Sequence, residues 1–201
     1  LWLFPRLPDF ETRYPEMQIS LATKNFTAPI SEEETFDLGI SWGRGEWVDL
    51  LFEPLFTNEV FPVCAPDFFE GKAPRMEAVR GHQLIHDRDN HWWSVFLNKM
   101  GVEGLTADQG RVFTQTGLCL DAAARGDGIA IGDEVTTRDY LEKGTLVVPF
   151  PLCMPSPDAY YILVPKAKSY SQESLRLFRN WLVEEATRHR AWFASFWADF
   201  Q

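Results

Sequence analysis

The amino-acid sequence predicts an α/β protein built as two lobes, and three observations support that class. Short runs of β-branched and aromatic residues alternate with segments of helical periodicity, which is typical of mainly parallel sheets covered by helices. The 13 glycines and 13 prolines are spread along the chain and divide it into many short elements. Two extended stretches, 52–66 and 146–159, are expected to cross between the lobes. One lobe would then comprise 1–63 plus 151–201, and the other 64–150.

The elements are expected in an alternating order, beginning with a helix. Leu3, Leu7, Phe10 and Tyr14 fall at helical spacing until Pro15 ends the pattern. The strands expected after it are 17–23, 36–41, 83–86, 110–115, 128–132 and 160–164, with further extended chain at 52–65 and 146–150. The later helices are expected at 27–35, 91–100 ending at Gly101, 118–125 ending at Gly126, 134–143 ending at Gly144, and in a long final helix capped by Ser171.

Composition narrows the possible functions. The 201 residues are 45% hydrophobic, which is enough for one large domain or two small lobes. With 29 acidic and 19 basic residues the net charge is −10, so the chain is a poor polyanion binder, and any DNA binding must reside in another segment. The three widely spaced cysteines do not form a disulfide framework. Because the chain also has no membrane-length apolar run and no signal peptide, we expect a cytoplasmic protein with no membrane association.

Two loops between a strand and the following helix carry polar residues suited to ligand binding. Thr23-Lys24-Asn25 follows one expected strand, and Thr114-Gln115-Thr116-Gly117 follows another. Open α/β sheets bind ligands beyond the carboxyl ends of their strands, and the N–H groups of a helix start favour a carboxylate or phosphate. The loops therefore predict a cleft for an anionic or zwitterionic molecule. Simple helix capping by Thr116 is an equally good explanation of that residue.

A metal site is a weaker alternative. His82 and His86 are four residues apart, with Asp87, Asp89 and His91 close by. However, no cysteine or glutamate lies at metal-ligand spacing, so we predict no metal and no cofactor. We expect a surface loop here, with His86 at the end of a strand and within reach of the ligand cleft.

Two sequence patterns suggest chemistry that their context does not support. Gly39-Ile40-Ser41-Trp42-Gly43 matches the nucleophile-elbow pattern of serine hydrolases, and Asp133 and His189 follow in the right order, but no convincing helix follows Ser41. The glycines of 126–132 follow a helix and precede a strand, which is the reverse of a dinucleotide-binding loop. We therefore expect no catalysis.

Six motifs together resemble one known family. They are Pro5-Arg6-Leu7-Pro8-Asp9-Phe10, Phe36 to Gly45, Val60 to Pro66, Leu84-Ile85-His86-Asp87, Ala122 to Gly132, and Phe178-Arg179-Asn180-Trp181-Leu182. In order and spacing they resemble the effector-sensing domain of LysR-type transcriptional regulators, in the branch that includes the glycine-cleavage activator and the β-lactamase regulator.

The resemblance implies a fold and a binding site. The fold would be two Rossmann-like lobes joined by two crossover segments, similar to type 2 periplasmic binding proteins, with a small effector bound between the lobes. Thr23 and Thr116, or its neighbour Thr114, fall on positions that contact the effector in this family, and Tyr160 falls on a cleft tyrosine of the β-lactamase regulator branch. The predicted ligand-binding site also includes Lys24, Trp42, His86 and Gln115.

The resemblance also implies partners. DNA would be bound only through a helix-turn-helix module outside this chain, and the protein would form a homodimer or homotetramer. The apolar start at Leu1 suggests that the family's first strand precedes it. The aromatic tail, 191–200, departs from the family's usual ending and is expected either to be buried or to contact another subunit. A solute-binding protein of transport shares the fold and is the principal alternative.

Overall fold

The computed structural model describes residues 1–23, 36–48, 50–70, 76–102, 106–166, 168 and 172–200. The chain forms two compact units. Unit 1 comprises Leu1–Trp2, Glu59–Pro155 and Phe200–Gln201, and unit 2 comprises Leu3–Asn58 and Ser156–Asp199. The chain therefore passes from unit 2 to unit 1 after Asn58 and returns after Pro155. The sequence prediction placed these two boundaries at 63/64 and 150/151.

Unit 1 contains a five-stranded sheet in the order β5-β4-β6-β3-β7. Its strands are β3 (Glu59–Val63), β4 (Leu84–Asp87), β5 (Arg111–Phe113), β6 (Ile129–Asp133) and β7 (Met154–Pro155). Strand β4 runs parallel to both β5 and β6, whereas β3 is antiparallel to β6 and β7. A 3-10 turn, η2 (Met76–Val79), precedes β4.

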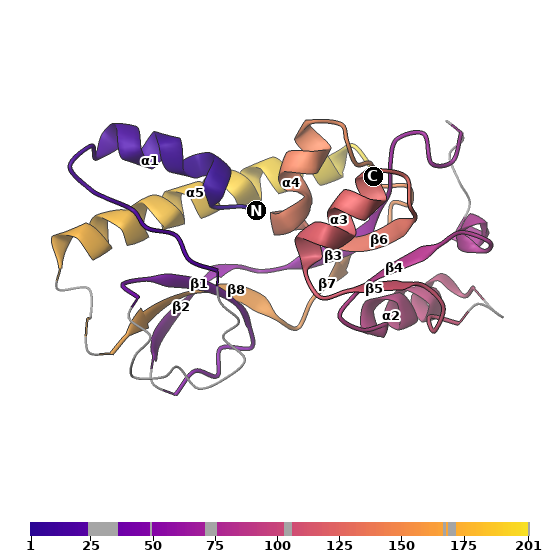
Figure 1. Cartoon of the computed structure of the whole chain (residues 1–201), viewed down its shortest axis with the longest axis horizontal. Helices are drawn as coiled ribbons and strands as arrows, with labels where there is room; N and C mark the ends of the chain where they lie inside the picture. The colour runs from indigo at the N-terminus through magenta and orange to yellow at the C-terminus, as the bar shows by residue number, and fades with distance from the viewer. Residues whose placement is uncertain are drawn as a thin grey trace. The chain divides into compact units, whose positions relative to one another are not determined.

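Three helices cover this sheet. Figure 1 shows α2 (His91–Met100) on one side and α3 (Thr116–Ala124) with α4 (Glu134–Glu142) on the other. Each helix is followed by a glycine of positive φ within two residues of its end, as the sequence predicted. The glycines are Gly101, Gly126 and Gly144, with φ of 66°, 82° and 67°.

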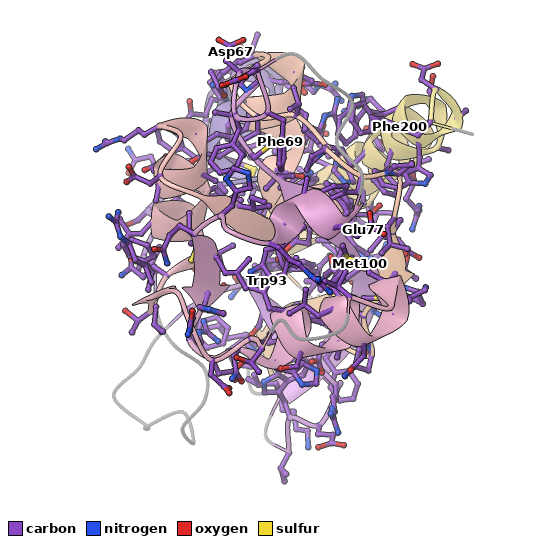
Figure 2. All side chains as sticks on the ribbon, turned by 90° about the vertical axis from the view of Figure 1, so that its right-hand side faces the viewer. Asp67, Phe69, Glu77, Trp93, Met100 and Phe200 are labelled. Carbon is purple, nitrogen blue, oxygen red and sulfur yellow. The ribbon has the colours of Figure 1, made fainter. Side chains whose placement is uncertain are left out.

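One buried hydrophobic cluster of unit 1 joins α2 to the sheet. Trp93 of α2 is buried, and its indole N–H donates to the Ile85 carbonyl at 2.9 Å, so the largest core side chain also satisfies its polar atom. Figure 2 shows Trp93 and Met100 on this side of the unit, with Phe69 higher in the view. The buried cluster comprises Val60, Cys64, Val79, Leu84, Trp93, Phe96, Leu97, Val102, Ala107, Ile129, Phe150 and Met154.

Unit 2 contains a three-stranded antiparallel sheet in the order β1-β8-β2. The strands are β1 (Gly39–Gly43), β2 (Leu50–Phe56) and β8 (Ala159–Pro165). Strand β8 is central and pairs on both edges, with Ser41 and Pro54 both opposite Tyr161. Three consecutive residues of β8, 162–164, are fully buried, which is the burial expected of an inner strand.

The helices of unit 2 are η1 (Phe4–Arg6), α1 (Leu7–Arg13) and the long α5 (Glu173–Ala198). Buried Phe10 of α1 packs against Phe178 and Trp181 of α5, with ring centroids 4.9 and 5.1 Å apart. The Trp181 indole N–H donates to Asp9 at 3.1 Å, and this hydrogen bond is the main reason that the pKa of Asp9 is lowered. Arg179 of α5 makes a two-pronged contact with Glu53 of β2, at 2.7 and 2.5 Å.

The structure corrects several details of the sequence analysis. The predicted strand 17–23 is irregular, and among the described strands none pairs with it, so its apolar pattern forms no ladder. Among the strands that the structure describes, β4 pairs in parallel with β5 and β6, and the other pairings are antiparallel. The expected extended chain at 52–65 is two strands separated at 57–58, and that at 146–150 forms only a bridge between Val147 and Cys64. The predicted helix 27–35 and the cap Ser171 lie outside the described residues.

Candidate functional site

The connections of the parallel strands in unit 1 create a topological switch point. The chain leaves β4 through α2 to reach β5 on one flank, and then returns through α3 to β6 on the other flank. The helices that follow β4 and β5 therefore lie on opposite sides of the sheet (Figure 1). In open α/β sheets ligands bind outside the carboxyl ends of strands at such a point. In the order β5-β4-β6 this point lies between β4 and β6. The carboxyl ends of β4 and β5 adjoin it.

One side-chain hydrogen bond joins the residues at these two strand ends. Asp87 is the last residue of β4 and lies opposite Phe113 of β5. Thr116 is the first residue of α3, and its hydroxyl donates to Asp87 Oδ2 at 2.5 Å. Thr116 therefore does not cap its helix. The N-cap is Gln115, whose side chain makes no capping bond and whose carbonyl accepts from the N–H groups of Leu118 and Cys119.

The remaining residues of this loop face solvent or hold the backbone. Thr114 and Gln115 are exposed. Arg88 has a φ of 68°, in the left-handed region that few non-glycine residues adopt, and its N–H donates to the Phe113 carbonyl at 2.6 Å. Backbone strain of this kind costs about 1–3 kcal/mol and often accompanies function. Asp89 accepts the His91 N–H at 2.9 Å at the start of α2.

His86 does not lie on a surface loop. It is 3% exposed, and its Nε2 lies 3.1 Å from the Gln109 carbonyl oxygen. The chain approaches the ring so closely that a Cβ at Gly110 would lie 2.2 Å from that nitrogen. His82 packs instead on Phe68, with ring centroids 4.9 Å apart. Within the part of the chain that the structure describes, no three histidine, cysteine or acidic residues are grouped to hold a metal.

The cysteine closest to this region, Cys119, has an unreactive thiol. Cys119 of α3 is buried, and its thiol lies 3.5 Å from the His86 carbonyl oxygen. Burial raises the pKa of Cys119 to about 12, and the neighbouring Asp87 carboxylate adds to the rise. The thiol is therefore protonated at neutral pH and is a poor nucleophile.

A second group of predicted residues lies in unit 2. Trp42 of β1 pairs with Tyr160 of β8 in the antiparallel register, so the two side chains are cross-strand neighbours. Trp42 is 40% exposed, whereas Tyr160 is half-buried and packs edge-on against Phe56 at 6.1 Å. Thr23 is exposed, and Lys24 lies outside the described residues.

The serine of the hydrolase pattern lacks the expected setting. Ser41 lies in the middle of β1, and no helix begins within 44–48. A nucleophile elbow requires a sharp turn directly into a helix. Gly43 of this pattern and the nearby Gly45 pack on aromatic rings instead: a Cβ at Gly43 would lie 3.1 Å from Trp47, and one at Gly45 would lie 3.2 Å from Tyr161.

The sequence analysis missed Asp87 as a partner of the threonine loop. Asp87 was noted beside the histidines and in the motif Leu84-Ile85-His86-Asp87, without a link to Thr116. A usable signal was present, since Asp87 directly follows the strand residues 84–86, and the carboxyl ends of parallel strands share one edge of a sheet. The identity of its partner depends on how α3 approaches β4, which spacing alone does not reveal.

Comparisons with known proteins agree with the fold. The sequence model of the LysR substrate binding domain family matches residues 1–187. The glycine cleavage system transcriptional activator of Escherichia coli (strain K12) is 28% identical over 194 residues, which are 96% of this chain and 63% of that protein. Its homolog in Haemophilus influenzae is 26% identical over 183 residues, 90% of this chain and 60% of that protein. The chain thus spans less than two thirds of the length of these relatives.

Solved structures give the same result. The effector domain of the transcriptional regulator AmpR of Pseudomonas aeruginosa has a TM-score of 0.79 and 25% identity, covering 96% of this chain and 92% of that chain. The AmpR effector binding domain from Citrobacter freundii has a TM-score of 0.78 at 23% identity, covering 92% of each chain, which shows the fold alone. The predicted α/β, type 2 periplasmic-binding-protein-like fold is confirmed. Among the described helices, none is long and apolar enough to cross a membrane.

Proposed function

Because the chain belongs to the LysR substrate binding domain family, we propose that it is the effector-sensing part of a bacterial transcription factor. One observation carries the proposal beyond family membership. At the switch point of unit 1, Thr114, Gln115 and Thr116 lie at the start of a helix whose N-cap side chain makes no capping bond, beside the Asp87 carboxylate. Neutral and charged hydrogen-bonding groups gathered at a strand edge suit a small polar ligand better than a macromolecule.

The proposed role is regulatory rather than catalytic. A ligand changes the behaviour of a regulator only if it binds one conformational state more tightly than another. DNA would be bound by a segment of the whole protein outside this chain, which agrees with the net charge of −10. We further propose a homodimer or homotetramer in the cytoplasm, an anionic or zwitterionic effector, and Trp42 and Tyr160 as further candidate contacts in unit 2.

A ligand screen tests the proposal. Amino acids, aromatic acids and peptidoglycan fragments would each be added to the purified chain, and thermal unfolding would be followed. A ligand that binds only the folded state stabilises it by about 2.7 kcal/mol at one hundred times its Kd. We expect at least one binder whose affinity falls in Thr116→Val, with Thr136→Val on α4 as the matched control. If every binder had the same affinity for Thr116→Val as for the unaltered chain, or if no compound bound at millimolar concentration, this site would be contradicted.

A further inference from the structure

The hydrogen bond between Thr116 and Asp87 determines whether the switch-point site accepts or donates hydrogen bonds to a ligand. A threonine hydroxyl has one hydrogen to donate and can also accept. In this structure that hydrogen is directed to Asp87 Oδ2 at 2.5 Å. The Thr116 oxygen can therefore offer only acceptor capacity to a ligand, and it cannot donate to a carboxylate while this bond persists.

The other oxygen of Asp87 also indicates a site that accepts hydrogen bonds from its ligand. Among the described residues, Asp87 Oδ1 is buried and accepts no hydrogen bond. The nearest cationic atom, Arg88 Nε, is 3.9 Å away, which is beyond hydrogen-bonding distance. The Arg88 side chain is 53% exposed, so water screens its charge. Because Oδ1 is shut off from solvent without a hydrogen-bond donor, the charge of this carboxylate is poorly compensated, and a ligand group that donates to its exposed part gains most.

The start of α3 does not reverse this preference. A helix N-terminus carries roughly half a positive elementary charge, which favours an anion. Asp87 already places a full negative charge beside the first residue of α3. A second anion would meet that charge, whereas an ammonium or amide N–H would be attracted to it. The protein's own carboxylate thus occupies the position that sequence analysis assigned to an anionic effector.

We infer that Asp87 is the specificity-determining residue of this site, selecting a ligand group that donates hydrogen bonds, such as an ammonium or amide N–H, and rejecting an isolated carboxylate or phosphate. The inference rests on the proposed effector-sensing function, and it replaces the anionic or zwitterionic effector proposed there by one that carries a hydrogen-bond donor. A zwitterionic effector would present its ammonium end to Asp87 and Thr116. A simple anion would leave the Asp87 and Thr116 acceptors unmatched, which costs more than losing one ordinary contact.

The test uses a thermal-shift screen with four sets of size-matched small compounds: zwitterions, amines, neutral amides and carboxylic acids. Every binder is then titrated against Asp87→Asn, which removes the charge and adds an N–H donor of similar size. We expect the binders of the unaltered chain to carry a donor, and their affinity to fall roughly 10- to 100-fold in Asp87→Asn. Carboxylic acids should gain affinity in the same variant.

Matched controls separate the site from a general change in charge. Asp127→Asn makes the same substitution in unit 1 at an ion pair with Arg111, and should leave binding unchanged. Thr116→Ser keeps the hydroxyl and should bind as the unaltered chain does. Binders that are all carboxylic acids would overturn the inference even if Asp87→Asn fails to fold. Donor-bearing binders that are indifferent to Asp87→Asn would overturn it while leaving the proposed function intact. The absence of any binder would reject both.

Discussion

Replacing Thr116 by valine tests the key hydrogen bond in the absence of any ligand. The two side chains have nearly the same shape, so the change removes the hydroxyl donor and little else. A hydrogen bond to a charged group contributes about 1.5–3 kcal/mol. Because the Asp87 side chain retains 26% of its exposure, water replaces part of the lost contact, and we expect a loss of about 1–2 kcal/mol. For a chain of this length that corresponds to a lowering of Tm by roughly 2–8 °C.

Urea unfolding and hydrogen exchange would measure this loss. Because β4 and α3 both belong to unit 1, exchange at their amides reports the stability of the unit that contains Thr116 and Asp87. Thr116→Ser should behave as the unaltered chain, and Thr114→Val, at an exposed position, should change stability by less than about 0.5 kcal/mol. If Thr116→Val were as stable as Thr116→Ser, the hydroxyl would not be committed to Asp87, and the argument for a donor-selective site would fail.

Three further predictions concern packing and pH. Phe10→Ala should destabilise unit 2 by about 3–5 kcal/mol in urea unfolding, because a buried ring would leave a cavity between α1 and α5, and a loss below about 1 kcal/mol would contradict that packing. Gly132→Ala should lower Tm, since the added Cβ would lie 2.3 Å from the buried Thr137 methyl carbon, and an unchanged Tm would show that α4 shifts at no cost. Burial raises the pKa of Cys64 and Cys119 from about 9 to about 12, so their stabilising contribution is complete below pH 9 and is lost as pH rises toward 12. A Cys64→Ala, Cys119→Ala double variant should therefore show a flatter decline of its urea midpoint across that range.

The helices of unit 1 could be predicted because their signals are local. The apolar periodicity of 91–100, 118–125 and 134–143, each followed by a glycine, predicts helix bounds that agree with α2, α3 and α4 to within about two residues. A glycine with positive φ ends a helix whatever lies around it. The prediction of a strand at 17–23 was wrong for the opposite reason, because its signal is not local. A strand exists only through its neighbours, and alternating apolar residues carry no information about whether a neighbour is present.

The location of the candidate site could be predicted from the sequence, but its preference for a hydrogen-bond donor could not. The loop 114–116 could be located because polar residues after a short strand and before a helix are typical of ligand sites. The bond from Thr116 to Asp87 joins residues 29 positions apart, and it depends on the approach of α3 to β4. His86 was misplaced because its burial depends on Gly110, whose missing side chain admits the ring. Ligand binding by these residues stays a prediction.

The position of β8 has a consequence for synthesis of the protein. Both β1 and β2 pair only with β8 among the described strands, yet roughly a hundred residues separate β2 from it in the chain. During synthesis β1 and β2 lack this partner until residues 159–165 emerge from the ribosome, whereas residues 59–155 of unit 1 emerge before then. Nascent chains arrested before residue 159 should consequently expose β1 and β2 to chaperones, and release of the last helix should remove that exposure.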